Sequence, residues 1–315
     1  MGERTQRDAF WSRVCEAARE DRDIVVITAD MGAPALDAFR SDLPRQFVNV
    51  GIAEQNAVAV GSGLALAGKK VFAYAIAPFI TLRCLEQTRV CQGIMGIPLA
   101  LVGVGAGFGY EESGPTHHLV EDIAVMRAIP GMTVHSVSDA VMAADIADRC
   151  CREPRPRYVR LDRQALPDLY PAGTVFPDGV TVLLTGRDGI IAATGVMTHT
   201  ALAVAGRLAA AGMSVGVLDV HTFPVDERAF LDRVADTTRI VSLEEHVLPG
   251  GLGSAIAENI ADRGLPIRLR RIGVPAEKAY GYIYGGRELI HRSCGLDTDT
   301  VEREVLYHLG TMKAP

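Results

Sequence analysis

Three segments in the first half of the sequence carry residues that could do chemistry: NVGIAEQN at 49–56, APFIT at 77–81 and EESGPTHH at 111–118. Glu54 stands in the first turn of an expected helix, where a carboxylate complements the helix dipole. The small residues beside it would also let a flat ligand approach the backbone closely. The glutamate therefore has two interpretations, a helix-start acid or a ligand-binding carboxylate.

The other two segments are open to similar alternatives. Phe79 ends an expected strand and opens a helix, so its ring can pack in the core or stack on a planar ligand. His117 and His118 follow the glycine-rich string GVGAGFG at 103–109. Adjacent side chains in an extended segment point to opposite sides, which disfavours a shared metal. An imidazole pKa near ~6.5 suits substrate hydrogen bonding or proton transfer.

Composition and charge exclude several classes of protein. The 315 residues carry 32 Lys and Arg against 38 Asp and Glu, for a net charge of −6, whereas a nucleic-acid-binding surface is basic. The uncharged stretch at 90–110 is rich in glycine, which favours a buried strand and a loop over a membrane span.

The six cysteines form no CxxC pair, and we expect free thiols. The charged start predicts a cytoplasmic protein.

Apolar runs alternate with amphipathic stretches, which predicts an α/β fold of two domains, each a mainly parallel sheet flanked by helices. Strands are expected at 23–30, 69–76, 98–105, 158–161, 189–196, 214–220, 239–245 and 267–274, and helices at 54–68, 82–91, 140–151, 198–212 and 250–264. A proline-rich stretch interrupts the alternation. We place the domains at 1–165 and 188–315, joined by a linker at 166–187.

In this order and spacing, the segments resemble the carboxyl-terminal portion of transketolases. The matching strings extend over nearly the whole chain: TADMG at 28–32, VGIAEQN at 50–56, APFITLRCLEQ at 77–87, SGPTHHLVEDIAVMRAIPGM at 113–132, RLDRQ at 160–164, HTFPVD at 221–226, SLEEHVLPGGLGSA at 242–255 and CGLD at 294–297. The resemblance implies a pyrimidine-binding domain of the thiamine-diphosphate-binding fold, followed by a transketolase C-terminal domain. It also implies thiamine diphosphate as the cofactor.

The resemblance assigns cofactor contacts to four residues. Glu54 matches the family glutamate that hydrogen-bonds the aminopyrimidine ring and favours its imino tautomer, and it is a catalytic candidate. Phe79 matches the aromatic residue that stacks on this ring, while Asp30 and Ile52 match positions near the cofactor. The implied activity is a transferase that moves a two-carbon ketol unit from a ketose or ketose-phosphate donor to an aldose acceptor.

Substrate contacts are implied at five further positions. His117 matches the histidine near the reacting carbons and is the second catalytic candidate. The remaining candidates are Ser113, His118, Arg163 and Arg7. Ser113 stands where the family has the aspartate that recognises a donor hydroxyl. The position of the family's phosphate-binding histidine falls in the glycine-rich string, so that histidine is absent here. These departures predict non-standard substrates in a specialised pathway.

One family motif is missing. The GDG motif and downstream asparagine that hold the metal on the diphosphate do not occur, since RDG at 187–189 lies before a strand of the last domain. We therefore expect one subunit of a split transketolase, with Mg²⁺ or Ca²⁺ held by an N-terminal partner subunit and no metal ligands in this chain. Two copies of each chain are expected, as an α2β2 heterotetramer.

Three alternatives remain open at this point. The β subunit of a 2-oxo acid dehydrogenase shares both domains and the glutamate, but lacks the SGPTHH string. A deoxyxylulose-phosphate-synthase-like enzyme is similarly close. The chain could also be a catalytically silent partner, which the presence of Glu54, Phe79 and His117 disfavours.

Overall fold

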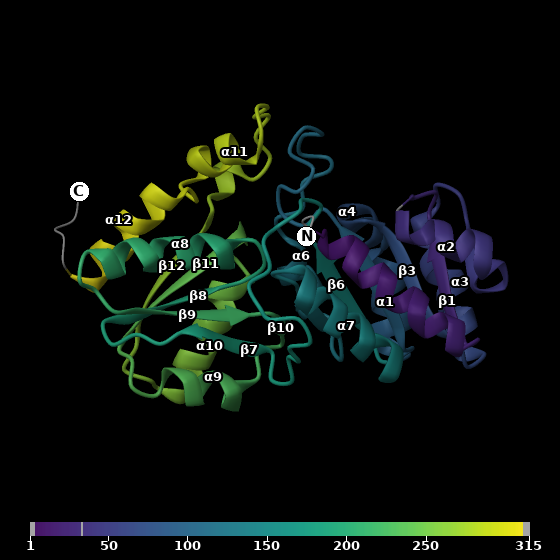
Figure 1. Cartoon of the computed structure of the whole chain (residues 1–315), viewed down its shortest axis with the longest axis horizontal. Coiled ribbons are helices and arrows are strands. Elements are labelled where there is room, and N and C mark those ends of the chain that lie inside the picture. Colours follow the sequence, from purple (N-terminus) through teal and green to yellow (C-terminus); the bar gives the residue numbers. More distant parts are fainter. Residues whose placement is uncertain (1–3, 33, 311–315) are drawn as a thin grey trace.

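The computed structural model describes residues 4–32 and 34–310 and consists of two α/β units that lie side by side along the longest axis (Figure 1). Each unit is built on one mainly parallel sheet with helices packed against it, which confirms the predicted fold class. None of the helices in these residues is long and apolar enough to cross a membrane.

The first sheet has the strand order β10-β5-β6-β4-β3-β1-β2, and only β10 is antiparallel to its neighbour. Its strands are β1 (Ile24–Thr28), β2 (Phe47–Asn49), β3 (Lys70–Ile76), β4 (Leu99–Val104), β5 (Thr133–Ser136), β6 (Arg157–Leu161) and β10 (Thr222–Phe223). The helices are α1 (Gln6–Glu20), α2 (Pro34–Asp42), α3 (Glu54–Leu66), α4 (Ala77–Ile80), α5 (Leu85–Thr88), α6 (Asp122–Arg127) and α7 (Ala140–Arg152).

Helices cover both faces of this sheet. Alternate residues of β1 point to opposite faces, so that Val26 packs with α1, α2 and α7, whereas Ile27 packs with α3 and α6. Trp11 of α1 is fully buried, with its ring centroid 5.0 Å from that of Tyr74 on β3. Strands covered on both faces read as continuous apolar runs, which is why β1 and β4 were recognisable in the sequence.

The second sheet has the order β12-β11-β8-β9-β7, with β7 antiparallel to β9. Its strands are β7 (Val180–Leu184), β8 (Gly189–Ala193), β9 (Val215–Val220), β11 (Arg239–Val247) and β12 (Arg268–Val274). The helices are α8 (Met197–Ala210), α9 (Glu227–Val234), α10 (Leu252–Arg263), α11 (Arg287–Cys294) and α12 (Thr298–Leu309).

The structure differs from the sequence-based expectation in three places. β7 lies inside the segment 166–187 assigned to the linker, because this edge strand is half exposed and follows a proline-rich stretch. The helix expected at 82–91 is a 3-10 turn at Leu82–Cys84, the short α5 and a π-helix at Arg89–Ile94. Finally, β10 comes from the second half of the chain but pairs with β5 at the edge of the first sheet.

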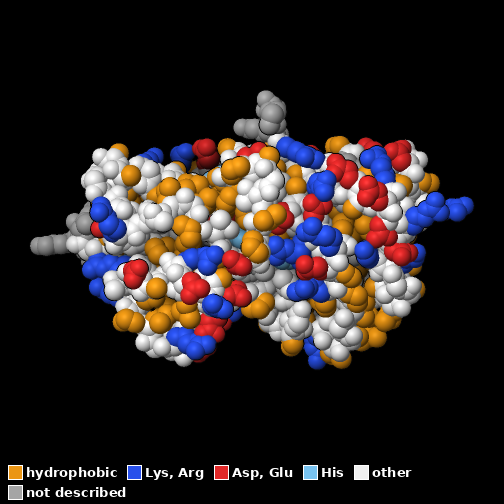
Figure 2. Space-filling view, turned by 60° about the horizontal axis from the view of Figure 1, so that its bottom comes forward, with side chains coloured by type: hydrophobic (Ala, Val, Ile, Leu, Met, Phe, Trp, Pro, Cys, Tyr) orange, Lys and Arg blue, Asp and Glu red, His pale blue; other side chains and the backbone are white. Residues whose placement is uncertain are grey.

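The surface carries both signs of charge. Figure 2 shows acidic and basic side chains interspersed over the face in view, with hydrophobic groups between them. All six cysteines are free thiols, and only Cys91 is not buried.

Candidate functional site

The segments singled out in the sequence follow the carboxyl ends of neighbouring strands. Asp30 follows β1, Glu54 opens α3 after β2, Phe79 lies in α4 after β3, and residues 111–118 follow β4. These four strands are adjacent in the order β4-β3-β1-β2. Because they are parallel, their carboxyl ends meet at one edge of the sheet, where α/β proteins bind ligands.

Glu54 is a buried carboxylate with one charged partner. Its side chain is only 5% exposed, and Oε2 lies 2.7 Å from Nη1 of Arg83. The Arg83 guanidinium also lies over the ring of Phe79, with its central carbon 4.1 Å from the ring centroid. A planar group that carries N–H donors is therefore held between an aromatic ring and a buried carboxylate.

His117 extends this group on the side of Phe79. The two ring centroids are 5.2 Å apart in an edge-to-face arrangement. Nδ1 of His117 lies 3.0 Å from the Thr116 hydroxyl, and the His117 backbone N–H donates to the Gly114 carbonyl. Glu54, Arg83, Phe79 and His117 thus form one continuous series of contacts, which brings both catalytic candidates to the same site.

Asp30 and Ile52 flank the start of α3. Asp30 has a left-handed backbone (φ 55°), which an aspartate tolerates better than most residues, and its backbone N–H donates to Asn49. The Asn49 side-chain amide donates to the Asp30 carboxylate at 3.2 Å, and its oxygen accepts from Gly51. Ile52 is 81% exposed. Such a large exposed apolar side chain at this edge can be covered by a ligand or another chain.

The candidate substrate contacts gather around Tyr110. The guanidinium of Arg163 lies 4.8 Å from the ring centroid of Tyr110, and the ring of His117 is 6.0 Å away. Arg7, in the first turn of α1, interacts electrostatically with the same tyrosine and pairs with Asp8. Ser113 is exposed, and its backbone N–H donates to the Tyr110 carbonyl.

His118 is separate from this group. It is 6% exposed, its ring stands edge-to-face on Phe108 with the centroids 5.1 Å apart, and burial lowers its pKa. The two adjacent histidines thus point to different surroundings, one toward Phe79 and the other toward Phe108. A substrate contact by His118 remains a prediction.

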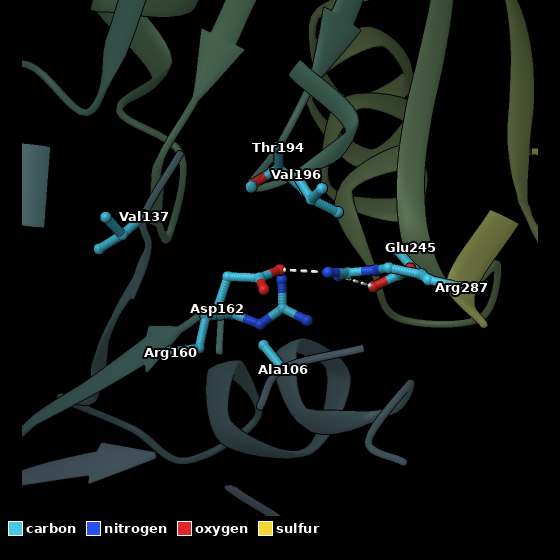
Figure 3. Close-up of a pocket in the computed structure, with 9 residues that line it drawn as sticks. Ala106, Val137, Arg160, Asp162, Thr194, Val196, Glu245 and Arg287 are labelled. Atoms are coloured by element: carbon cyan, nitrogen blue, oxygen red, sulfur yellow. Dashed lines mark hydrogen bonds and ion pairs between the residues drawn. The ribbon is translucent and has the colours of Figure 1, made fainter. Parts of the chain in front are cut away.

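Two charged groups were not predicted from the sequence. Arg83 is the only charged residue between positions 77 and 85, a signal that could have marked it as functional. The second group consists of Glu245 and Arg287 of the second domain, which meet Asp162 at the domain junction (Figure 3). No pattern in the sequence relates these three positions. Within residues 4–32 and 34–310, no three His, Cys, Asp or Glu side chains gather as metal ligands would.

The fold is a pair of α/β domains, and the comparisons with known proteins identify their family. The chain matches the transketolase pyrimidine binding domain over residues 3–168 and the transketolase C-terminal domain over residues 179–299. The chain therefore belongs to the transketolase family, as the resemblance indicated.

Several relatives are subunits of divided transketolases. The chain is 36% identical over 304 residues to one subunit of the apulose-4-phosphate transketolase of Phocaeicola vulgatus, covering 95% of this chain and 96% of that protein. It is 35% identical over 271 residues to the 6-deoxy-6-sulfo-D-fructose transketolase subunit SqwH of a Clostridium species, covering 85% and 84%. A solved split-gene transketolase, an inactive β4 tetramer, matches with a TM-score of 0.88 at 31% identity, covering 97% of this chain and 98% of that one.

Proposed function

We propose that this chain is the C-terminal subunit of a two-chain transketolase that depends on thiamine diphosphate. Its substrates would be a ketose donor and an aldose acceptor, between which a two-carbon ketol unit is transferred. The observation that carries the proposal is the planar Arg83 guanidinium held between the Glu54 carboxylate and the Phe79 ring. An aminopyrimidine is also planar and presents an N–H donor, so the same two side chains fit it.

Each candidate residue has a task in this proposal. When bound, thiamine diphosphate would supply an acidic carbon whose deprotonated form is a nucleophile toward a ketose carbonyl. Glu54 would hydrogen-bond the pyrimidine nitrogen and hold a proton there. Its burial favours this hydrogen bond because water does not compete for the carboxylate. Phe79 would stack on the ring, and His117, in contact with Phe79, would hydrogen-bond the substrate near the reacting carbons. Asp30 and Ile52 would border the cofactor.

The anionic end of the substrate would bind near Tyr110. Arg163 lies over the ring of this residue and Arg7 interacts with it electrostatically, and guanidinium groups suit phosphate or sulfonate oxygens. Two relatives are named for ketoses outside the ordinary pentose phosphates, one phosphorylated and one carrying a sulfo group. We therefore propose a non-standard ketose with a terminal anionic group as the donor.

A second chain would complete the site. Both relatives are named as subunits, and the β4 assembly of a split-gene transketolase is described as inactive. We propose an α2β2 heterotetramer in which the other chain holds the diphosphate through Mg²⁺ or Ca²⁺. The free buried thiols favour a cytoplasmic location.

Calorimetry with thiamine diphosphate and Mg²⁺ tests the proposal. The chain is co-expressed with a subunit that carries the GDG motif, and binding is compared among the mixture and each chain alone. We expect the mixture to bind thiamine diphosphate at least about tenfold more tightly than either chain alone, which is equivalent to about 1.4 kcal/mol of binding free energy. Equal binding by the partner alone would refute a role for this chain in the cofactor site. Binding without ketose turnover would favour the silent-partner alternative.

A further inference from the structure

Arg287 is a buried arginine of the second domain that contacts the first domain. It opens α11, and its side chain is 6% exposed. Nε and Nη2 donate to the two carboxylate oxygens of Glu245, at 2.8 Å and 2.6 Å, while Nη1 lies 2.7 Å from Asp162 of the first domain. Figure 3 shows this guanidinium between the two acids at the domain junction.

The same residue contacts both segments that carry candidate substrate residues. Nη1 of Arg287 donates to the side-chain oxygen of Gln164 at 3.2 Å, next to Arg163. The backbone N–H of Arg287 donates to the Glu111 carboxylate at 3.1 Å. Glu111 in turn accepts from the Gln164 amide at 2.5 Å. Residues 111–118 and 160–164 are therefore tied to each other and to the second domain through one residue.

Glu245 fixes the third segment, the glycine-rich string before residue 111. Its Oε2 accepts from the Phe108 backbone N–H at 3.0 Å, and His291 contacts its other oxygen. Gly107 has a positive φ of 59°, and a Cβ there would lie 1.8 Å from Oε2 of Glu245. The backbone thus approaches the carboxylate more closely than any side chain would allow.

A buried ion cluster of this kind is a weak device for stability, because desolvation offsets much of the Coulombic attraction. Its effect on the orientation of the groups that it binds is greater, since the five guanidinium N–H groups have fixed directions.

Two buried polar atoms near the cluster, Nη2 of Arg160 and Oγ1 of Thr194, have no partner among the described residues. They line a cavity of about 10 Å³, room for about one water that would extend the same network.

We infer that Arg287 is a positioning residue, through which the C-terminal domain sets the orientation of the segments carrying His117 and Arg163. The inference rests on the proposed function for what those two residues bind. It gives the last domain a part in substrate recognition as well as in assembly. Because Arg287 touches neither of them directly, its effect would pass through Glu111, Gln164 and Asp162.

Two variants of the two-chain enzyme test the inference, Arg287→Lys and Glu111→Ala. The first keeps the charge and loses the fork of donors, while the second removes a half-buried acid and leaves the ion cluster intact. Arg292→Ala is the matched control, because Arg292 lies on the same helix, is 66% exposed and pairs only loosely with Glu288 at 3.7 Å.

We expect both variants to lower kcat/KM for the ketose donor on the order of tenfold or more, chiefly through a higher KM, with thiamine diphosphate affinity little changed. Hydrogen exchange of the chain alone should quicken in residues 105–118 and 160–164 in both variants, but not in Arg292→Ala. A loss of melting temperature with unchanged KM and exchange in these segments would show a purely structural role and overturn the inference. A wild-type two-chain enzyme that binds no thiamine diphosphate would refute the proposed function. Faster exchange in the two variants would still support Arg287 as a positioning residue in that case.

Discussion

Glu54→Gln separates the catalytic interpretation of this acid from the helix-start interpretation. Glutamine keeps the shape of the side chain and an oxygen that can still accept from Arg83, but it cannot exchange a proton. The lost charge costs little stability, because Arg83 is 44% exposed and its charge is partly screened. We expect a loss of about 1 kcal/mol in the free energy of unfolding. A residue that moves a proton in the rate-limiting step contributes about 10²- to 10⁴-fold, or about 3–5 kcal/mol of activation free energy.

The assay is ketol transfer by the reconstituted two-chain enzyme at saturating thiamine diphosphate, beside a melting curve for each variant. Glu304→Gln is the matched control, because Glu304 also pairs with an arginine at 2.7 Å, and that arginine is 48% exposed. The control should melt like the Glu54→Gln variant and retain full activity. If Glu54→Gln kept more than about a tenth of wild-type kcat, a proton-transfer role worth at least about 10²-fold would be refuted.

Two further predictions concern charged side chains. Arg83→Ala removes the cation that occupies the contacts with Glu54 and the Phe79 ring. Because the cofactor ring would use the same contacts, the two-chain variant should bind thiamine diphosphate several-fold more tightly in calorimetry. Weaker binding would mean that Arg83 itself holds the cofactor. Asp219 accepts from the hydroxyls of Ser138, Tyr170 and Thr198, and burial raises its pKa from 3.8 to about 7. Between these values the folded chain binds more protons than the unfolded chain, so stability falls as pH rises. Melting temperatures at pH 5 and pH 8 should differ less for Asp219→Asn than for wild type, and equal differences would contradict this pKa.

Much of the fold was predictable because buried parallel strands are apolar on both faces. β1, β4, β8 and β9 are buried throughout and stand out as continuous runs. β2, β5 and β10 are short, and β7 is a half-exposed edge strand, so their sequences lack that signal. The irregular turns between Leu82 and Ile94 depend on packing that no local periodicity records.

The site was predictable in part for a similar reason. Glu54, Phe79 and His117 follow β2, β3 and β4, and the carboxyl ends of parallel strands meet at one edge of a sheet. Arg83 was missed because the direction of a long flexible side chain within a 3-10 turn is set by the surrounding packing. Arg287 lies 123 positions from Gln164 and 176 from Glu111, and no spacing rule connects such distant positions.

β10 limits how this protein can be divided by design. Its two residues belong to the second half of the chain but form the edge of the first sheet beside β5 (Figure 1). Expression of the pyrimidine-binding half by itself would strip that edge and leave β5 open to pairing with a neighbouring molecule. Domain exchange among divided transketolases should therefore transfer both halves together, or supply a replacement for this short strand.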